Sequence, residues 1–277
     1  MGAGSLLRTQ SLRRFSVYRR VDLGSEARPT QSSVAIVERS TQVTPEDHPP
    51  KVALITGAAS GIGAEIATLL SKRGWKVAGL DLRGSNTDSS LIADAADPVV
   101  MRAAVDQATR ELGPISLLVT VAGHYEMLPI SEIGIERWHR MLAVHLGGTR
   151  NACAAVLPGM VERGKGHVIT ISSELALAGG DGDAHYVAAK GAIIGFTKSL
   201  AAEVAGRGVR VNSVAPGPTD TPLLAPDSPW RDPLFLETLP LRRLVRPEEV
   251  AEAVLFLAEE GDYFCGQIVS PNAGAVI

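Results

Sequence analysis

The chain has 277 residues, of which 45% are hydrophobic, and a formal net charge of -3 at pH 7. This length predicts one globular α/β domain with a tail, and the nearly balanced charge argues against nucleic acid or an anionic membrane surface as partners. No apolar run approaches the roughly 20 residues that span a bilayer. We therefore expect a cytoplasmic protein that acts on a small molecule.

The sequence carries little sulfur or metal chemistry. Its cysteines, Cys153 and Cys265, stand far apart and form no CxxC pair, and His and carboxylate residues do not cluster at ligand spacing. This pattern is typical of reduced thiols in a cytosol-like compartment, and we expect no metal site.

Residues 1–50 differ in composition from the remainder. The first acidic residue follows five arginines, Arg8, Arg13, Arg14, Arg19 and Arg20, and Ser, Thr, Gln and Pro dominate up to the segment EDHPP. We expect a disordered, Arg-rich extension. No apolar segment follows the arginines, as a secretory signal would require. A mitochondrial or other organelle transit peptide stays open as an alternative if the source is eukaryotic.

From Lys51 onward, short apolar segments alternate with longer helical ones. Strands are predicted over 52–56, 76–80, 116–121, 167–172, 209–214 and 266–270, and helices over 61–73, 98–111, 136–163, 184–205 and 247–260. The nearly continuous apolarity of the strands is typical of a sheet buried on both faces. The order predicts a doubly wound Rossmann fold, a mainly parallel sheet with helices on both faces, in a single catalytic domain over 51–277.

The segment TGAASGIG, residues 56–63, joins the first predicted strand to the first predicted helix. Gly57, Gly61 and Gly63 allow a tight turn and a close approach of backbone, and free amides at a helix N-terminus attract a pyrophosphate. Asp81 ends the second strand, 18 positions after Gly63, where a carboxylate can accept both hydroxyls of an adenosine ribose. That carboxylate favours NAD(H), while nearby Arg83 keeps NADP(H) open because it could accommodate a 2'-phosphate.

The segment AHYVAAKGA, residues 184–192, holds Tyr186 and Lys190 four positions apart. Such positions share one face of a helix, so the pair alone does not differ from an ordinary helix surface. A free tyrosine is a poor base at neutral pH, but a neighbouring cation favours its phenolate. The pair therefore predicts proton transfer, with Tyr186 as general base in oxidation and general acid in reduction.

Taken together and in this order, these motifs resemble the short-chain dehydrogenase/reductase family over essentially all of 51–277. TGAASGIG is similar to the family's TGxxxGxG turn, YVAAK to its YxxxK motif, and DAADP (94–98) to its adenine-contacting segment. VNSVAPGPTDTP (211–222) resembles the segment that lies against the nicotinamide. The resemblance implies an NAD(P)-dependent oxidoreductase that interconverts a secondary alcohol and a ketone by hydride transfer.

The same resemblance implies the roles of individual residues. Ser173, 13 positions before Tyr186, is expected to bind the substrate oxygen, and Lys190 to hold the nicotinamide ribose. The cofactor contacts expected on this basis are Gly57, Ser60, Gly61, Ile62, Gly63, Asp81, Asp94, Ala95, Ala122, Gly123, Tyr186, Lys190, Pro216, Gly217, Thr219 and Thr221. A covalent serine mechanism is not expected, because no His and acid stand in an activating pattern and SSE lacks the G-x-S-x-G elbow.

Two segments depart from the family pattern. His145, in LAVHLGGT, replaces an Asn that holds a water in the family's proton relay, and TVAG (120–123) replaces NNAG. Imidazole can shuttle protons near neutral pH, so we predict His145 as a fourth catalytic residue. A packed histidine with the relay carried elsewhere, and an impaired enzyme, stay open. We interpret the change to TVAG as structural, because Ala122 and Gly123 keep the close backbone approach.

Loops after the strands are expected to hold the substrate. The candidates are His124, Tyr125, Glu174, Leu223 and Leu224, with Trp230, Leu234 and Phe235 completing a lid. A largely apolar pocket favours a neutral, moderately hydrophobic alcohol or ketone.

Two other functions stay open. One is reduction of 3-oxoacyl groups on an acyl carrier, against which Asp81 argues because biosynthetic reductions commonly use NADPH. The other is a non-catalytic dinucleotide-binding regulator, which would not need Ser173, Tyr186 and Lys190. The resemblance also implies a homotetramer, although the ending SPNAGAVI differs from the family's usual double glycine.

Overall fold

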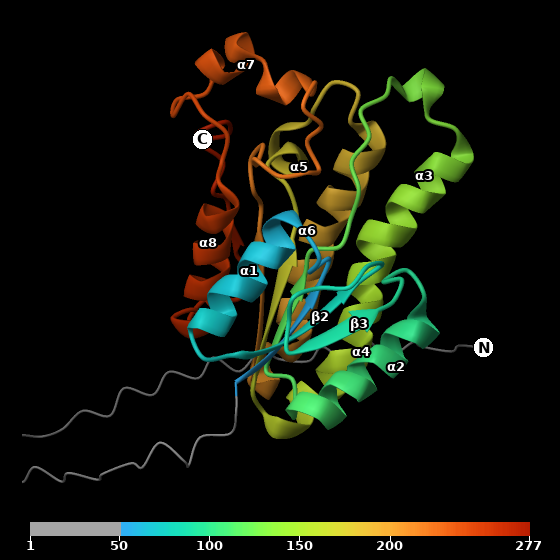
Figure 1. Cartoon of the computed structure of the whole chain (residues 1–277), viewed down its shortest axis with the longest axis vertical. Helices are drawn as coiled ribbons and strands as arrows, with labels where there is room; N and C mark the ends of the chain where they lie inside the picture. Colours follow the sequence, from blue (N-terminus) through green and yellow to red (C-terminus); the bar gives the residue numbers. More distant parts are fainter. Residues whose placement is uncertain (1–50) are drawn as a thin grey trace, which may run out of the picture. The chain divides into compact units, whose positions relative to one another are not determined.

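Seven parallel strands form one sheet in the computed structural model, which describes residues 51–277 (Figure 1). The strands are β1 (Val52–Thr56), β2 (Lys76–Asp81), β3 (Ser89–Ile92), β4 (Leu117–Thr120), β5 (Gly166–Ile171), β6 (Val209–Val214) and β7 (Ile268–Val269). Their order across the sheet is β3-β2-β1-β4-β5-β6-β7. The order reverses between β1 and β4, which is where doubly wound sheets bind ligands. The predicted doubly wound parallel fold is confirmed, while the extension predicted over 1–50 lies outside the described residues.

Helices cover both faces of the sheet, as the apolar strands require. On one face, α1 (Gly61–Lys72) and α8 (Pro247–Glu259) pack side by side over β1, β4 and β5 (Figure 1). On the other face lie α2 (Pro98–Leu112), α4 (Gly148–Arg163) and α6 (Ala184–Val204). All five residues of β1 are buried, because its odd and even side chains enter different cores. Burial of both faces holds the strand ends, and hence the site, in fixed positions.

One strand was not predicted from the sequence. In β3 the residues Ser89 and Leu91 are buried while Ser90 and Ile92 are exposed. This alternation is typical of an edge strand with one solvated face. The other strands were recognised by continuous apolar runs, a pattern that β3 lacks. At the opposite edge, β7 is shorter than the predicted 266–270.

The predicted helix over 136–163 is divided into three parts. Helix α3 (Ile135–Leu142) leads into a π-helical turn, η3 (Ala143–Gly147), which continues into α4. Turns of this kind occur frequently at functional sites because the added residue redirects one side chain. Here the turn carries His145. The apolar and small residues of the turn do not differ from those of an ordinary helix, so the sequence does not predict a break in the helix.

The segment between β6 and α8 returns across the carboxyl edge of the sheet. Thr219 forms a parallel bridge with Val245, and the short helix α7 (Pro233–Thr238) lies between them in sequence. A four-residue helix, α5 (Leu175–Ala178), follows β5, and neither short helix was predicted. From Lys51 to Ile277, none of the helices combines the length and the hydropathy that a membrane crossing requires.

Candidate active site

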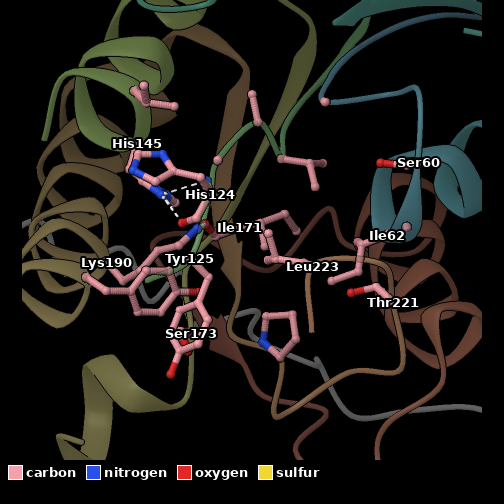
Figure 2. Close-up of a pocket in the computed structure, with 18 of the residues that line it drawn as sticks. Ser60, Ile62, His124, Tyr125, His145, Ile171, Ser173, Lys190, Thr221 and Leu223 are labelled. Carbon is pink, nitrogen blue, oxygen red and sulfur yellow. Dashed lines mark hydrogen bonds between the residues drawn. The ribbon is translucent and has the colours of Figure 1, made fainter. Parts of the chain in front are cut away.

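A cavity of about 690 Å³ opens at the carboxyl ends of the central strands. Figure 2 shows Ser60, Ile62 and Thr221 on one side of it and Lys190 and Ser173 on the other. Every predicted cofactor, substrate and catalytic residue lines this cavity except Gly63 and the two lid residues Leu234 and Phe235. Gly63 instead packs inside the turn, where a Cβ atom would lie 2.0 Å from the carbonyl oxygen of Gly57. The motif therefore uses Gly63 for packing the helix on the turn rather than for lining the cavity.

The glycine turn leaves room for a ligand at the start of α1. Gly57 and Gly61 have φ values of 73° and 55°, which favour glycine, and a Cβ on Gly57 would lie 2.8 Å from the backbone nitrogen of Ala122. Ser60 caps α1 in an extended conformation, and its side chain makes no capping hydrogen bond within the described chain. The first amides of α1 therefore lack a side-chain acceptor there, which fits a pyrophosphate at the helix N-terminus.

Asp81 is held at the end of β2 by two backbone groups. Its Oδ2 accepts a hydrogen bond from Ala59 N–H at 3.1 Å, and its Oδ1 accepts one from Arg83 N–H at 3.2 Å. These bonds fix the carboxylate beside the glycine turn, on the cavity wall. A carboxylate keeps further acceptor sites when each oxygen takes one hydrogen bond, so Asp81 can also accept from ribose hydroxyls.

Two residues outside the predicted set shape the neighbouring loops. Asn151 on α4 donates from Nδ2 to the carbonyl oxygens of Ala95 and Ala96, at 3.1 and 3.0 Å. Thr56 Oγ1 accepts from the backbone N–H of Ala122 at 3.2 Å. Thr56 belongs to the quoted glycine motif, but Asn151 is 56 and 55 positions from its two partners in sequence, and no local pattern signals these contacts.

The segment after β6 forms the wall opposite α6. Thr219 donates from Oγ1 to the carbonyl oxygen of Gly217 at 2.7 Å, which tightens the turn. A Cβ atom on Gly217 would lie 2.7 Å from the Cα atom of Asn272, so this position accepts glycine alone without a shift of backbone. Pro216 accepts a hydrogen bond from the N–H of Glu174 at 3.1 Å. That bond joins the ends of β5 and β6 beneath the cavity.

Tyr186 and Lys190 lie together at the inner end of the cavity. Lys190 is 4% exposed, and its Nζ donates to the carbonyl oxygen of Ile171 at 2.9 Å and lies 5.7 Å from the centroid of the Tyr186 ring. Burial lowers the pKa of Lys190 to about 7. Burial also raises the pKa of Tyr186, and the charge of Glu174 adds to that rise. The predicted lowering of the Tyr186 pKa is therefore absent from the protein alone, where burial is the largest cause of the rise.

Ser173 and Ser172 occupy different environments at the end of β5. Ser172 Oγ donates to Val214 O at 3.3 Å and so bonds within the sheet. Ser173 Oγ donates to Glu174 Oε2 at 2.9 Å and accepts from the N–H of Leu175 at 3.2 Å. Of the two serines, Ser173 has the hydroxyl that can be redirected to a substrate.

His145 contacts the backbone of the loop after β4. Its Nε2 lies 3.1 Å from His124 N and 2.8 Å from His124 O, and these contacts are drawn as dashed lines in Figure 2. The imidazole packs so closely on Gly123 that a Cβ there would lie 2.3 Å from Cε1. Burial, followed by the charge of Lys190, lowers the pKa of His145 well below its ordinary value. This arrangement favours the packed-histidine interpretation over a charged proton shuttle at neutral pH.

Tyr125 and Trp230 link two loops over the substrate side of the cavity. The indole N–H of Trp230 donates to the Tyr125 hydroxyl at 2.9 Å, and the Tyr125 ring meets the Tyr186 ring edge-on with centroids 5.1 Å apart. Leu223 and Leu224 also line the cavity. Leu234 and Phe235 do not, contrary to the prediction: they border a separate surface hollow. Both residues lie in α7, a helix that was not predicted from the sequence.

Asp183 ends the loop that runs from Glu174 to the start of α6, a loop whose position between Ser173 and Tyr186 predicts substrate contacts. Its side chain is fully buried, and its charge contributes to the raised pKa of Tyr186. Within residues 51–277 we find no group of three or more His, Cys, Asp and Glu side chains placed to hold a metal ion.

Comparison with known proteins identifies the family. Residues 51–232 match the model of the short chain dehydrogenase family. The 3-oxoacyl-(acyl-carrier-protein) reductase of Thermotoga maritima is 36% identical over 242 residues, which cover 82% of this chain and 98% of that protein. The D-threitol dehydrogenase of Mycolicibacterium smegmatis is 37% identical over 225 residues, which cover 76% of this chain and 86% of that protein.

Two solved structures are similar in fold. The 3-ketoacyl-(acyl-carrier-protein) reductase from Brucella melitensis, complexed with NADH, aligns with a TM-score of 0.77 and 27% identity, over 82% of this chain and 98% of that one. The ligand-free aldohexose dehydrogenase of Thermoplasma acidophilum aligns with a TM-score of 0.74 and 32% identity, over 81% of this chain and 93% of that one. With the glycine turn, Asp81 and the Ser173, Tyr186 and Lys190 set around one cavity, this chain belongs to the short-chain dehydrogenase/reductase family and is an NAD(P)(H)-binding oxidoreductase.

Proposed function

We propose that this protein interconverts a secondary alcohol and a ketone with NAD(H). The observation that carries the proposal is the shared cavity, which holds the glycine turn and Asp81 together with Ser173, Tyr186 and Lys190. A regulator that only binds dinucleotides needs the first group but has no chemical need for the second. The arrangement of both groups around one space therefore supports catalysis.

The residues present fit a nicotinamide dinucleotide. The start of α1 would hold the pyrophosphate and Asp81 the adenosine ribose, and Thr221, whose side chain lies against Gly61, borders the same end of the cavity. When bound, the nicotinamide supplies the acceptor or donor of hydride. The oriented carboxylate of Asp81 supports NAD(H) over NADP(H), because a 2'-phosphate would meet a like charge.

The proton chemistry is assigned to side chains of this chain. In oxidation, Tyr186 takes the hydroxyl proton of the substrate, and in reduction it returns that proton to the substrate oxygen. Ser173 donates its hydroxyl hydrogen to the same oxygen and stabilises the charge that develops there. Lys190, whose Nζ lies 5.7 Å from the centroid of the Tyr186 ring, is assigned to stabilise the phenolate during proton transfer, although it does not lower the Tyr186 pKa in the protein alone. His145 acts as a positioning residue, because its ring holds the His124 backbone beside Tyr186.

A direct test measures the absorbance of reduced nicotinamide with a panel of secondary alcohols and both oxidised cofactors. The proposal expects turnover with NAD⁺ and its loss in Tyr186→Phe. Binding of cofactor without turnover of any alcohol or ketone would instead support the dinucleotide-binding regulator.

A second candidate is reduction of a 3-oxoacyl group on an acyl carrier. The named activity of the Thermotoga maritima relative, which this chain matches over 98% of that protein, favours it. The similar Brucella melitensis reductase is complexed with NADH, so a preference for NAD(H) does not by itself argue against this substrate class. Comparing kcat/KM for an acetoacetyl thioester with kcat/KM for free ketones distinguishes the two candidates.

The assembly and the location of the protein stay predictions. We propose a homotetramer without nucleic-acid or membrane partners, in the cytoplasm, with a mitochondrial location as the alternative for a eukaryotic source. Mass photometry of the full chain tests the oligomeric state, and imaging of a C-terminal fusion in the source cell tests the location.

A further inference from the structure

Glu174 places a buried carboxyl group beside the serine that binds the substrate oxygen. The residue is 5% exposed, lines the cavity and accepts the hydrogen bond from Ser173 Oγ at 2.9 Å. Its backbone is held separately, since its N–H donates to Pro216 O and its carbonyl accepts from the N–H groups of Leu177 and Ala178. The side chain is therefore available to a ligand, and its replacement leaves these backbone bonds in place.

The hydroxyl of Ser173 has a single proton to donate. In the structure that proton is directed to Glu174 Oε2, while the N–H of Leu175 occupies an acceptor site on Ser173 Oγ. To bind a substrate oxygen as a donor, Ser173 must turn its proton away from the carboxylate. A buried carboxylate that loses a hydrogen-bond donor is destabilised, so a ligand that brings a new donor to the same place binds more favourably.

A substrate can supply that donor only from a position close to its reacting oxygen. Ser173 Oγ and Glu174 Oε2 are themselves within hydrogen-bond distance, and so are the two oxygens of a vicinal diol in its gauche form. One oxygen then accepts from Ser173 while the hydroxyl on the adjacent carbon donates to Glu174. A ketone or alcohol without that hydroxyl leaves the carboxylate without the donor that Ser173 had supplied.

We infer that Glu174 is a specificity-determining residue that accepts a hydrogen bond from a hydroxyl on the carbon next to the reacting carbon. The substrate class is then a vicinal diol and the corresponding α-hydroxy ketone, which is more polar than the moderately hydrophobic alcohol expected from the sequence. The inference rests on the proposed function, because it takes Ser173 as the ligand of the reacting oxygen.

Protonation offers Glu174 a second way to lose its negative charge. Burial raises the pKa of Glu174 to about 7, so the neutral acid, which can donate to Ser173 Oγ, is populated below that pH. Tyr186 and Asp183 are coupled to Glu174 by charge, and Lys190, His124, His145 and Tyr125 line the same cavity. Titration of these groups changes the rates for a diol and for its matched monoalcohol together. The ratio of the two rates therefore reports Glu174, and it should rise between pH 6 and pH 8.

The test compares kcat/KM for butane-2,3-diol and butan-2-ol with NAD⁺, and repeats the comparison with cyclohexane-1,2-diol and cyclohexanol. The full-length wild-type protein should prefer each diol by about 10-fold to 100-fold, as expected for a hydrogen bond to a charged group. Glu174→Leu should bring the ratio to about 1, and Glu174→Gln should give an intermediate value. Glu126→Gln is the matched control, because Glu126 pairs with Arg137 and does not line the cavity.

Binding isolates recognition from chemistry. In the Tyr186→Phe background with NAD⁺, calorimetry should show tighter binding of the diol than of the monoalcohol, and Glu174→Leu should remove the difference. Equal turnover of diol and monoalcohol by the wild-type protein, or a preference that survives Glu174→Leu, would overturn the role of Glu174 and leave the proposed function standing. Absence of turnover with every alcohol and both cofactors would overturn the proposed function, and this inference with it.

Discussion

The imidazole of His145 is bonded to the backbone of His124, with Nε2 at 2.8 Å from the carbonyl oxygen and 3.1 Å from the nitrogen. The ring also meets the Tyr186 ring edge-on, with centroids 5.5 Å apart. A side chain on the π-helical turn therefore holds the loop that borders the proton-transfer residues. Its buried, neutral ring is suited to positioning that loop.

His145→Asn should keep substantial turnover, because an amide can both donate to and accept from the backbone of His124. His145→Ala should lower the free energy of unfolding by about 1 to 3 kcal/mol, since it removes a buried ring and its hydrogen bond to the His124 backbone. Steady-state kinetics and urea denaturation measure the two effects. If His145→Asn loses activity as completely as Tyr186→Phe, with folding and cofactor binding intact, then the imidazole itself takes part in catalysis.

Asp81→Asn should change the choice of cofactor. The amide keeps one oxygen, which can accept from the backbone N–H of either Ala59 or Arg83, and the substitution removes the charge that repels a 2'-phosphate. The ratio of kcat/KM for NADP⁺ to kcat/KM for NAD⁺ should rise by about 10-fold or more. Adding Arg83→Ala should reverse part of that gain if the guanidinium holds the phosphate. An unchanged ratio in Asp81→Asn would contradict the assignment of Asp81 to the ribose.

Lys190 should make the stability of the protein depend on pH above neutrality. Burial lowers the pKa of Lys190 to about 7 from its ordinary value of 10.5, so between these values the unfolded chain binds more protons than the folded one. The free energy of unfolding should therefore rise from pH 7 to pH 9. Lys190→Met should flatten that rise, as measured by urea denaturation at each pH. Equal slopes in both proteins would show that Lys190 is not neutralised by burial.

The sequence predicts the central part of the fold because its signals are local. Buried parallel strands such as 52–56 and 209–214 are continuous apolar runs, and the structure has strands with those same bounds. The glycine turn is a short motif whose residues lie close together in sequence. The same is true of the pair formed by Tyr186 and Lys190. Family spacing then connected Ser173 to Tyr186, and the cavity contains both residues.

What the sequence does not predict depends on contacts between distant segments or on small changes in backbone. The bond between Trp230 and Tyr125 joins residues 105 positions apart. The π-helical turn at His145 lies inside a segment whose composition is helical throughout. The hydrogen bond from Ser173 to Glu174 joins sequence neighbours. Burial of the Glu174 carboxylate, however, depends on the packing of other segments around it, which the local sequence SSE does not predict.

The central claim is that Tyr186 transfers the proton in an NAD(H)-dependent oxidation and reduction. The most direct measurement is the rate of NAD⁺ reduction by a panel of secondary alcohols and diols, in the wild-type protein and in Tyr186→Phe. The account predicts turnover in the wild-type protein and a decrease of at least about 10²-fold in the variant, with NADH binding unchanged by fluorescence titration. Turnover by Tyr186→Phe at the wild-type rate would contradict it.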